Sequence, residues 1–326
     1  MSTLSAGAVA PDFTLTAVDG QPISLHGALK KGPVVLVFFK VGCPTSQYAF
    51  PFFERMYQAN HGGNVSFIGI SQDNAKNTQA FLKQYGVTFP VALEDPGNYA
   101  VSNAYRLTNV PTLFYVSQSG EIEISSVSWS KAEVEAVNRK LAENRRQSIG
   151  KYLWDEGKGL FFDYDLEKEQ RSSYRYATTF YPLWAGLATD AQARAVVKNL
   201  GAFERAGGIA MSEKESQGQW DYPFGWAPIQ LLAIEGMRRY GHKQEADRVS
   251  TEFLSMVLEN FAHDKTIREK YNVVTRSAET NVAVGYAANV IGFGWTNAAF
   301  VELLDLLPPE KVAPVTQTTP AAASRN

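Results

Sequence analysis

The chain has 326 residues, and at about 150 residues per domain this length suggests two domains. Hydrophobic residues make up 45% and charged residues 20% of the chain, which excludes a collagen-like or wholly disordered protein. The formal net charge of −2 gives no basic surface field for nucleic acid or acidic lipid, so we expect neither as a partner.

The sequence also argues against membrane and metal chemistry. The longest uninterrupted apolar stretch runs from Pro33 to Phe39, whereas a membrane-spanning helix needs about 20 such residues. No export-type segment precedes Lys30, the first Lys or Arg of the chain, so we expect a cytoplasmic chain. The one cysteine, Cys43, excludes an intramolecular disulfide and a multi-cysteine zinc site, and we expect no metal and no cofactor.

Residues 1–130 alternate between apolar runs and stretches with helical spacing. The runs at 34–39 and 65–70 predict strands that are buried on both faces of a sheet. Further strands are expected at 89–93, 112–116 and 121–126, and helices at 48–57, 77–85 and 99–105. This alternation predicts a mixed α/β sheet that is covered on both faces.

After residue 130 the pattern becomes helical, and we expect no strand pair there. The helices expected lie at 133–153, 174–187, 190–204, 226–240, 243–263 and 296–306, with a loop rich in Gly, Ser and aromatics at 207–225. The Pro-, Ala- and Thr-rich end predicts a disordered tail. We therefore expect domains at 1–144 and 145–308, followed by the tail at 309–326.

The expected domain boundary falls inside one helical segment. The stretch from Lys131 to Trp154 contains no proline and a single glycine, Gly150, and its Ala, Glu, Lys, Arg and Leu residues favour a helix. We therefore expect the last helix of the first domain to continue into the first helix of the second.

The lone cysteine is expected at the start of a helix, directly after the strand 34–39. Backbone N–H groups and the helix dipole at such a position stabilise a thiolate, so we expect the pKa of Cys43 to be lowered. The alternative is that Cys43 is a small buried apolar residue, as most single cysteines are.

Residues 1–130 resemble the thioredoxin-like redoxins related to alkyl hydroperoxide reductase. The resemblance rests on the segments 10–13 (APDF), 38–44 (FFKVGCP) and 109–112 (NVPT). It implies a thioredoxin-like fold in which Pro44 and Pro111 flank Cys43. Peroxiredoxins carry a proline and a Thr or Ser upstream of the reactive cysteine, where this chain has Leu36 and Lys40, so we do not expect a peroxiredoxin.

The redox turn of the family usually holds a second cysteine, and here that position is Ser46. A serine hydroxyl can donate a hydrogen bond to a thiolate, but it cannot attack a mixed disulfide. The resemblance therefore implies a monothiol site for glutathionylation or mixed-disulfide formation, or a relic of a dithiol site.

Residues 219–228 read QWDYPFGWAP. This segment resembles the signature of α,α-trehalases, glycoside hydrolase family 37. Further similar segments follow the family's order, at 152–155 (YLWD), 161–166 (FFDYDL), 269–273 (EKYNV) and 292–297 (GFGWTN). The resemblance covers about residues 145–307 and implies a site that binds trehalose or a similar small sugar.

Sugars present apolar ring faces for stacking and a rim of hydroxyls for hydrogen bonding. The side chains expected to contact such a substrate are Gln219, Trp220, Asp221, Trp226, Trp295 and Asn297. The alternative is that these aromatic residues only pack the loop at 207–225.

Hydrolysis with inversion needs two carboxyl groups, one as general acid and one as general base. The resemblance assigns the base to Glu269, which would otherwise be interpreted as part of a solvated charge cluster. No segment matches the motif that carries the family's acid. The carboxyl groups left as substitutes are Asp163, Asp165, Asp221 and Glu279.

The resemblance implies a fold with an α/β thioredoxin-like domain followed by an all-α partial (α/α) toroid. The family's toroid has twelve helices, and the expected helices supply about half of them. Half a ring exposes apolar helix faces, which predicts self-association or a second chain.

Three hypotheses follow. The chain is a degenerate fusion without turnover, a trehalase completed by a partner, or a thiol-redox protein whose helical part binds a sugar or a partner without turnover.

Overall fold

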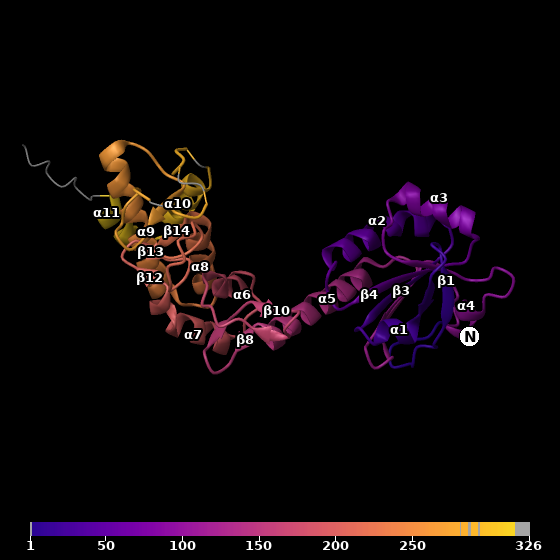
Figure 1. Cartoon of the computed structure of the whole chain (residues 1–326). Coiled ribbons are helices and arrows are strands. Elements are labelled where there is room, and N and C mark those ends of the chain that lie inside the picture. The colour runs from indigo at the N-terminus through magenta and orange to yellow at the C-terminus, as the bar shows by residue number, and fades with distance from the viewer. Residues whose placement is uncertain (1, 281, 286–287, 293, 317–326) are drawn as a thin grey trace, which may run out of the picture. The chain divides into compact units, whose positions relative to one another are not determined.

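The computed structural model describes residues 2–280, 282–285, 288–292 and 294–316 (Figure 1). The chain divides into two compact units, Met1–Gln147 and Ser148–Asn326, which are described separately below. In the described residues, no helix is long and apolar enough to cross a membrane.

The first unit contains a mixed sheet of seven strands in the described residues. Strand β3 lies parallel to β4, and β4 lies parallel to β5, while the remaining neighbours are antiparallel. Across the sheet the order is β2 (Pro22–Ser24), β1 (Thr14–Ala17), β5 (Val91–Leu93), β4 (Ser66–Ser71), β3 (Val34–Phe39), β6 (Thr112–Val116) and β7 (Ile122–Val127).

Side chains of β3 alternate between two apolar cores, one on each face of the sheet. Phe39 packs with Phe50 and Phe81 on one face, and Phe38 packs with Tyr105 and Phe114 on the other. The first core is covered by α2 (Pro44–Ala59) and α3 (Ala75–Tyr85), and the second by α1 (Leu25–Leu29) and α4 (Ala100–Ala104). The predicted α/β sheet with buried central strands is confirmed.

Helix α5 (Lys131–Tyr152) is continuous, as the sequence predicted, and the boundary between the two units falls within it. Its N-terminal part contributes Val134, Val137 and Leu141 to the core of the first unit. Residue Ile149, past the boundary, packs against the core of the second unit.

The second unit is built around α8 (Ala227–Arg239), which packs against α6, α9 and α10. The other helical elements are η1 (Ala177–Phe180), α6 (Tyr181–Trp184), α7 (Asp190–Lys198), η2 (Leu200–Ala202), α9 (Lys243–Asp264), α10 (Gly294–Leu306) and α11 (Pro309–Thr316). The helical character predicted for this region is confirmed.

The prediction that this region contains no strand pair is wrong. Four short antiparallel ladders connect its loops: β8 (Trp154–Asp155) with β9 (Leu160–Phe161), β10 (Tyr164–Asp165) with β11 (Gln170–Arg171), β12 (Glu204–Arg205) with β13 (Gly208–Ile209), and β14 (Phe224–Trp226) with β15 (Lys270–Asn272). Strands of two or three residues are too short to produce the alternating pattern by which a strand is predicted.

The prediction of a disordered tail at 309–326 is wrong for its first part, because residues 309–316 form α11. Val315 is buried, and the ammonium of Lys311 lies 2.9 Å from the carboxylate of Asp247 on α9. These contacts order the segment despite its composition. The rest of the predicted tail, 317–326, lies outside the described residues.

Candidate functional site

The first candidate site is the turn between β3 and α2. Cys43 is the N-cap residue of α2, and Pro44 occupies the first turn of that helix. The thiol donates to the carbonyl oxygen of Val110 at 3.2 Å, and the Val110–Pro111 peptide bond is cis. The structure thus brings Cys43, Pro44 and Pro111 together at this turn.

The environment of Cys43 favours the thiolate. Burial raises the pKa of the thiol, but hydrogen bonds from the backbone and side chain of Ser46, and then of Thr45, outweigh this effect and lower the pKa below its usual value. Ser46 is fully buried, and its hydroxyl lies within hydrogen-bonding reach of the Cys43 sulfur. That hydroxyl is therefore available to the sulfur once the thiol ionises.

The second candidate site lies at the ladder between β14 and β15. In this ladder Trp226 lies directly opposite Lys270, and Gly225 lies opposite Tyr271. A β-carbon at Gly225 would lie 2.4 Å from the Cγ1 atom of Val273 and 2.7 Å from the carbonyl oxygen of Ile209. Only glycine allows this close approach, which brings the segments 219–228 and 269–273 together.

Three tryptophans form a cluster beside this ladder. The rings of Trp220 and Trp226 stack with their centroids 3.7 Å apart and an interplanar angle of 6°. Trp295 meets both rings edge-on, at 6.1 Å from Trp220 and 5.7 Å from Trp226. Trp226 is completely buried, whereas Trp220 is 40% exposed. Trp220 therefore presents a ring to solvent, and Trp226 supports it from below.

Glu269 precedes β15 and is almost completely buried. Its side chain is therefore not part of an exposed charge cluster, which was the alternative interpretation of the sequence. Its carboxylate lies 3.5 Å from the ammonium of Lys270, which is also buried. The Lys270 ammonium donates to the carbonyl of Ala288 at 2.9 Å and lies 5.5 Å from the centroid of the Trp226 ring. Lys270 thus contacts both the carboxylate and the tryptophan cluster.

Asp221 is a buried carboxylate surrounded by hydroxyl groups. It accepts hydrogen bonds from the side chains of Tyr174 and Ser212 and, at 3.0 Å, from the backbone N–H of Tyr222. Burial raises its pKa, but hydrogen bonds from Ser212, Ser216 and Tyr174 outweigh burial and lower the pKa. Asp221 is therefore held in its ionised form.

The two amide residues of the predicted site differ in their environment. The backbone carbonyl of Gln219 accepts a hydrogen bond from the Trp226 indole at 2.8 Å, and its side chain lies against the backbone of Gly285. Asn297 is exposed on α10, two residues after Trp295. Phe293, which belongs to the last matching segment, lies outside the described residues.

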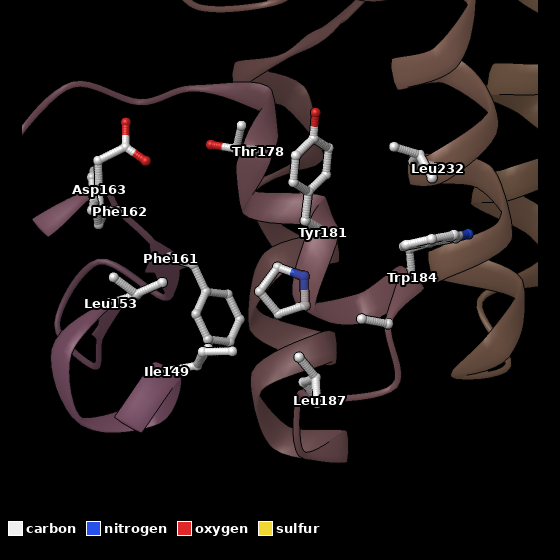
Figure 2. Close-up of a pocket in the computed structure, with 12 residues that line it drawn as sticks. Ile149, Leu153, Phe161, Phe162, Asp163, Thr178, Tyr181, Trp184, Leu187 and Leu232 are labelled. Atoms are coloured by element: carbon white, nitrogen blue, oxygen red, sulfur yellow. The ribbon is translucent and has the colours of Figure 1, made fainter. Parts of the chain in front are cut away.

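The remaining candidate carboxyl groups lie outside this cluster. Asp165 is in β10, with its carboxylate 3.1 Å from the ammonium of Lys168, and Glu279 is exposed. Asp163 lines a separate groove of about 600 Å³. Figure 2 shows its carboxylate and the Thr178 hydroxyl at one edge of that groove. Apolar side chains such as Phe161 and Leu187 line other parts of it.

Sequence reasoning missed three residues that shape the second site, namely Tyr174, Ser212 and Lys270. Tyr174 was expected to begin a helix at 174–187 but lies in a loop, and Ser212 belongs to the loop at 207–225, so only the fold brings them to Asp221. Lys270 is adjacent to Glu269 in the sequence, but two neighbouring charges normally indicate exposure. Within the described residues, no group of three His, Cys, Asp or Glu side chains could hold a metal ion.

Two family models match the chain. The model described as Trehalase matches residues 111–308, and the model described as AhpC/TSA family matches residues 6–125. The chain is therefore a fusion of a redoxin-like part and a trehalase-like part, as the sequence predicted. The two matches overlap at residues 111–125, a segment of the first unit that contains β6 and most of β7.

Curated relatives match the trehalase-like part. A cytosolic neutral trehalase from Emericella nidulans is 39% identical over 196 residues, which cover 54% of this chain and 26% of the relative. A cytosolic neutral trehalase from Saccharomyces cerevisiae is 40% identical over 185 residues, which cover 51% of this chain and 25% of the relative. The chain thus spans about a quarter of the length of the curated relatives it matches.

Solved structures match each part of the chain. Neutral trehalase Nth1 from Saccharomyces cerevisiae matches with a TM-score of 0.49 and 35% identity, over 60% of this chain and 34% of that chain. The thioredoxin domain of a thiol-disulfide oxidoreductase from Bacteroides vulgatus matches with a TM-score of 0.39 and 20% identity, over 43% of this chain and 99% of that chain.

Proposed function

We infer the function from one premise: the chain belongs to the trehalase family, whose model matches residues 111–308. We propose that the second unit is one part of a trehalose-hydrolysing site. It holds the sugar and supplies the general base, and a second polypeptide supplies the general acid. The observation that supports this proposal is the ladder that sets Trp226 opposite Lys270, whose ammonium lies 3.5 Å from the Glu269 carboxylate.

In this proposal Glu269 is the general base. An inverting glycosidase uses one carboxylate to take a proton from the attacking water while a carboxylic acid on the other side protonates the leaving oxygen. A buried carboxylate loses the stabilisation of water and must be compensated by a partner. The ammonium of Lys270, 3.5 Å away, provides this compensation.

Trp220 is the proposed stacking platform, because it is the exposed member of the stacked pair. Trp226 and Trp295 fix its orientation, while Gln219 and Asn297 offer amide groups to the sugar hydroxyls. The role proposed for Asp221 is to hold the loop that carries Trp220 by collecting hydroxyl donors.

None of the four substitute carboxyl groups suits the role of general acid, which must be protonated before it reacts. The pKa of Asp221 is lowered by hydrogen bonds from Ser212, Ser216 and Tyr174, which outweigh burial. The pKa of Asp165 is lowered by hydrogen bonds from Lys168. Glu279 is exposed, and Asp163 lines the separate groove. We therefore place the acid on a second chain.

A surface for this second chain is the groove of Figure 2, which lies within the second unit. Tyr181 and Trp184 line it and are 40% and 42% exposed, and an apolar surface of this kind is usually covered by a partner. We propose that the helices of the unit form part of an α/α toroid and that the partner contributes the missing helices. A second copy of the chain would bring another base and no acid, so a different polypeptide is the better partner.

Calorimetry with trehalose tests the sugar-binding part of this proposal. We expect the full chain to bind trehalose, and Trp220→Ala to weaken binding at least about tenfold because the stacking surface is lost. Trp184→Ala is the matched control, since its exposure is similar and it lies in the separate groove. Equal binding by both variants, or no binding by the wild type, would contradict the assignment of Trp220.

A second candidate function is thiol-disulfide exchange at Cys43, with the helical unit as a sugar- or partner-binding module. The lowered pKa of Cys43 and the buried hydroxyl of Ser46 favour it. Because Ser46 cannot attack a disulfide, exchange at this site stops at a mixed disulfide. The rate of alkylation measured against pH would give the pKa, and a value near 8.5 would exclude an activated thiolate.

We also propose the cytosol as the compartment. The curated relatives are named cytosolic neutral trehalases, and a free thiol persists in a reducing compartment.

A further inference from the structure

Two tyrosines, Tyr174 and Tyr176, lie beside the loop that carries Trp220. Their rings stack with the centroids 6.0 Å apart and an interplanar angle of 27°. The Tyr176 hydroxyl donates to the backbone carbonyl of Trp220 at 2.6 Å, and the Tyr174 hydroxyl donates to the carboxylate of the next residue, Asp221. Tyr174 is 38% exposed and Trp220 is 40% exposed. Two partly exposed aromatic rings are therefore tied to the same stretch of chain.

A small polar hollow adjoins the ring of Tyr174. It has a volume of about 100 Å³ and is lined by Ser173, Tyr174, Arg175, Glu213 and Lys214. The hydroxyl of Ser212 donates to the Asp221 carboxylate and lies 3.0 Å from the carbonyl oxygen of Lys214. Both walls of the hollow are therefore connected to Asp221, one through Tyr174 and the other through Ser212.

An ion pair in the hollow leaves hydrogen-bonding groups for a ligand. One guanidinium nitrogen of Arg175 lies 2.7 Å from one carboxylate oxygen of Glu213, and within the described residues neither side chain makes a further hydrogen bond. The two opposite charges compensate each other, and the charge of the exposed Lys214 is screened by solvent. This balance favours a neutral polar ligand over an anion or a cation.

An aromatic ring beside such a pair matches the chemistry of a sugar. A sugar ring presents an apolar face that stacks on aromatic side chains, and its hydroxyls both donate and accept hydrogen bonds. Here Tyr174 offers the stacking surface, the Glu213 carboxylate accepts from hydroxyls, and the Arg175 guanidinium donates to them. The small volume suits one edge of a single sugar ring rather than a whole disaccharide.

We propose that this hollow is a further sugar subsite, which receives the third ring of a neutral trisaccharide whose other two rings lie at Trp220. The inference rests on the proposed sugar site at Trp220, and it extends the class of ligand to oligosaccharides longer than trehalose. The subsite makes and breaks no covalent bond. Its role is to increase affinity for the longer sugar.

Calorimetry with the full chain tests this inference. The probes are trehalose and three trisaccharides in which one further glucose is attached to trehalose through three different linkages. A phosphate monoester of trehalose is included as an anionic probe. The quantity compared is the affinity for each trisaccharide divided by the affinity for trehalose.

We expect at least one trisaccharide to bind about tenfold more tightly than trehalose, as two or three additional hydrogen bonds imply. Glu213→Ala and Arg175→Ala should each reduce this gain to about twofold or less and leave trehalose binding unchanged. A partly exposed ion pair contributes little to stability, so both variants should fold. Glu215→Ala is the matched control, because this exposed glutamate lies on the same loop outside the hollow, and it should preserve the gain.

Three results would overturn the inference while leaving the sugar site at Trp220 intact. The first is that no trisaccharide binds more tightly than trehalose, and the second is a gain that persists in Glu213→Ala. The third is that the phosphate ester binds more tightly than every trisaccharide and loses this advantage in Arg175→Ala, which would assign the hollow to an anion. Binding of neither trehalose nor any trisaccharide would refute both the proposed sugar site and this inference.

Discussion

The ammonium of Lys270 lies 3.5 Å from the carboxylate of Glu269, and both side chains are almost completely shielded from water. The ladder between β14 and β15 fixes this pair, because it sets Trp226 opposite Lys270. Asn289 holds the same backbone, accepting from the N–H of Lys270 at 3.2 Å and donating to its carbonyl at 2.9 Å. The pair therefore links the proposed base to the tryptophan cluster.

The first prediction concerns the energy of this pair. Lys270→Met leaves a buried negative charge at Glu269 without its partner, and such a loss costs about 3–5 kcal/mol in the free energy of unfolding. The double variant Lys270→Met with Glu269→Gln removes both charges, so it should be more stable than Lys270→Met alone. Urea denaturation of the wild type, the two single variants and the double variant measures the coupling, and strictly additive effects would show that the two groups do not interact.

The second prediction concerns Glu252 on α9. Burial, with a smaller contribution from the nearby Glu204, raises its pKa to about 7, although Arg248 and Arg276 act in the opposite direction. The folded state therefore binds a proton that the unfolded state releases near pH 4.5. The stability contributed by Glu252 is fully present below that pH, and it is lost as the pH rises through 7.

Glu252→Gln should remove this dependence. Because the side chain is partly accessible to solvent, we expect a gain of about 1 kcal/mol at pH 8 and little change at pH 5. Thermal unfolding at the two pH values provides the measurement, and Glu310→Gln on the exposed start of α11 provides the control. A variant that unfolds at the wild-type temperature at pH 8 would contradict the burial of a neutral Glu252.

The third prediction concerns Gly225 in β14. A methyl group there would lie 2.4 Å from Val273 and 2.7 Å from the Ile209 carbonyl, so Gly225→Ala should separate the two strands and cost about 1–3 kcal/mol. Stacked indoles produce a paired positive and negative circular dichroism band, and this signal from Trp220 and Trp226 should weaken. Gly201→Ala, where a β-carbon meets no atom within 4 Å, should leave both stability and signal unchanged.

The central strands of the first unit could be predicted because their composition alone determines their burial. Strands β3 and β6 are continuous apolar runs, and such runs are stable only between two covered faces. Strands β1 and β2 and helix α1 were missed, because they are three to five residues long and partly exposed. Short elements of this kind depend on the neighbouring sheet edge, which no local pattern reveals.

The second site could be predicted in its residues but not in its arrangement. The segments carrying Trp220 and Glu269 were identified by their resemblance to a known signature, while local charge favoured exposure of Glu269. Its burial results from a ladder between strands more than 40 residues apart in the chain. The sequence likewise indicated that Trp226 would face the sugar, whereas the structure buries it beneath Trp220.

The most direct test of the central claim is glucose release from trehalose in a complementation assay. The full chain is mixed with a fragment of the Emericella nidulans neutral trehalase from which the segment matching this chain has been removed. The same fragment mixed with the relative's own matching segment is the positive control. We predict no glucose from either component alone, release from the mixture, and complete loss of release when the chain carries Glu269→Gln. With an active positive control, a mixture that releases no glucose, or release that persists with Glu269→Gln, would contradict the assignment of Glu269 as the base of a composite site.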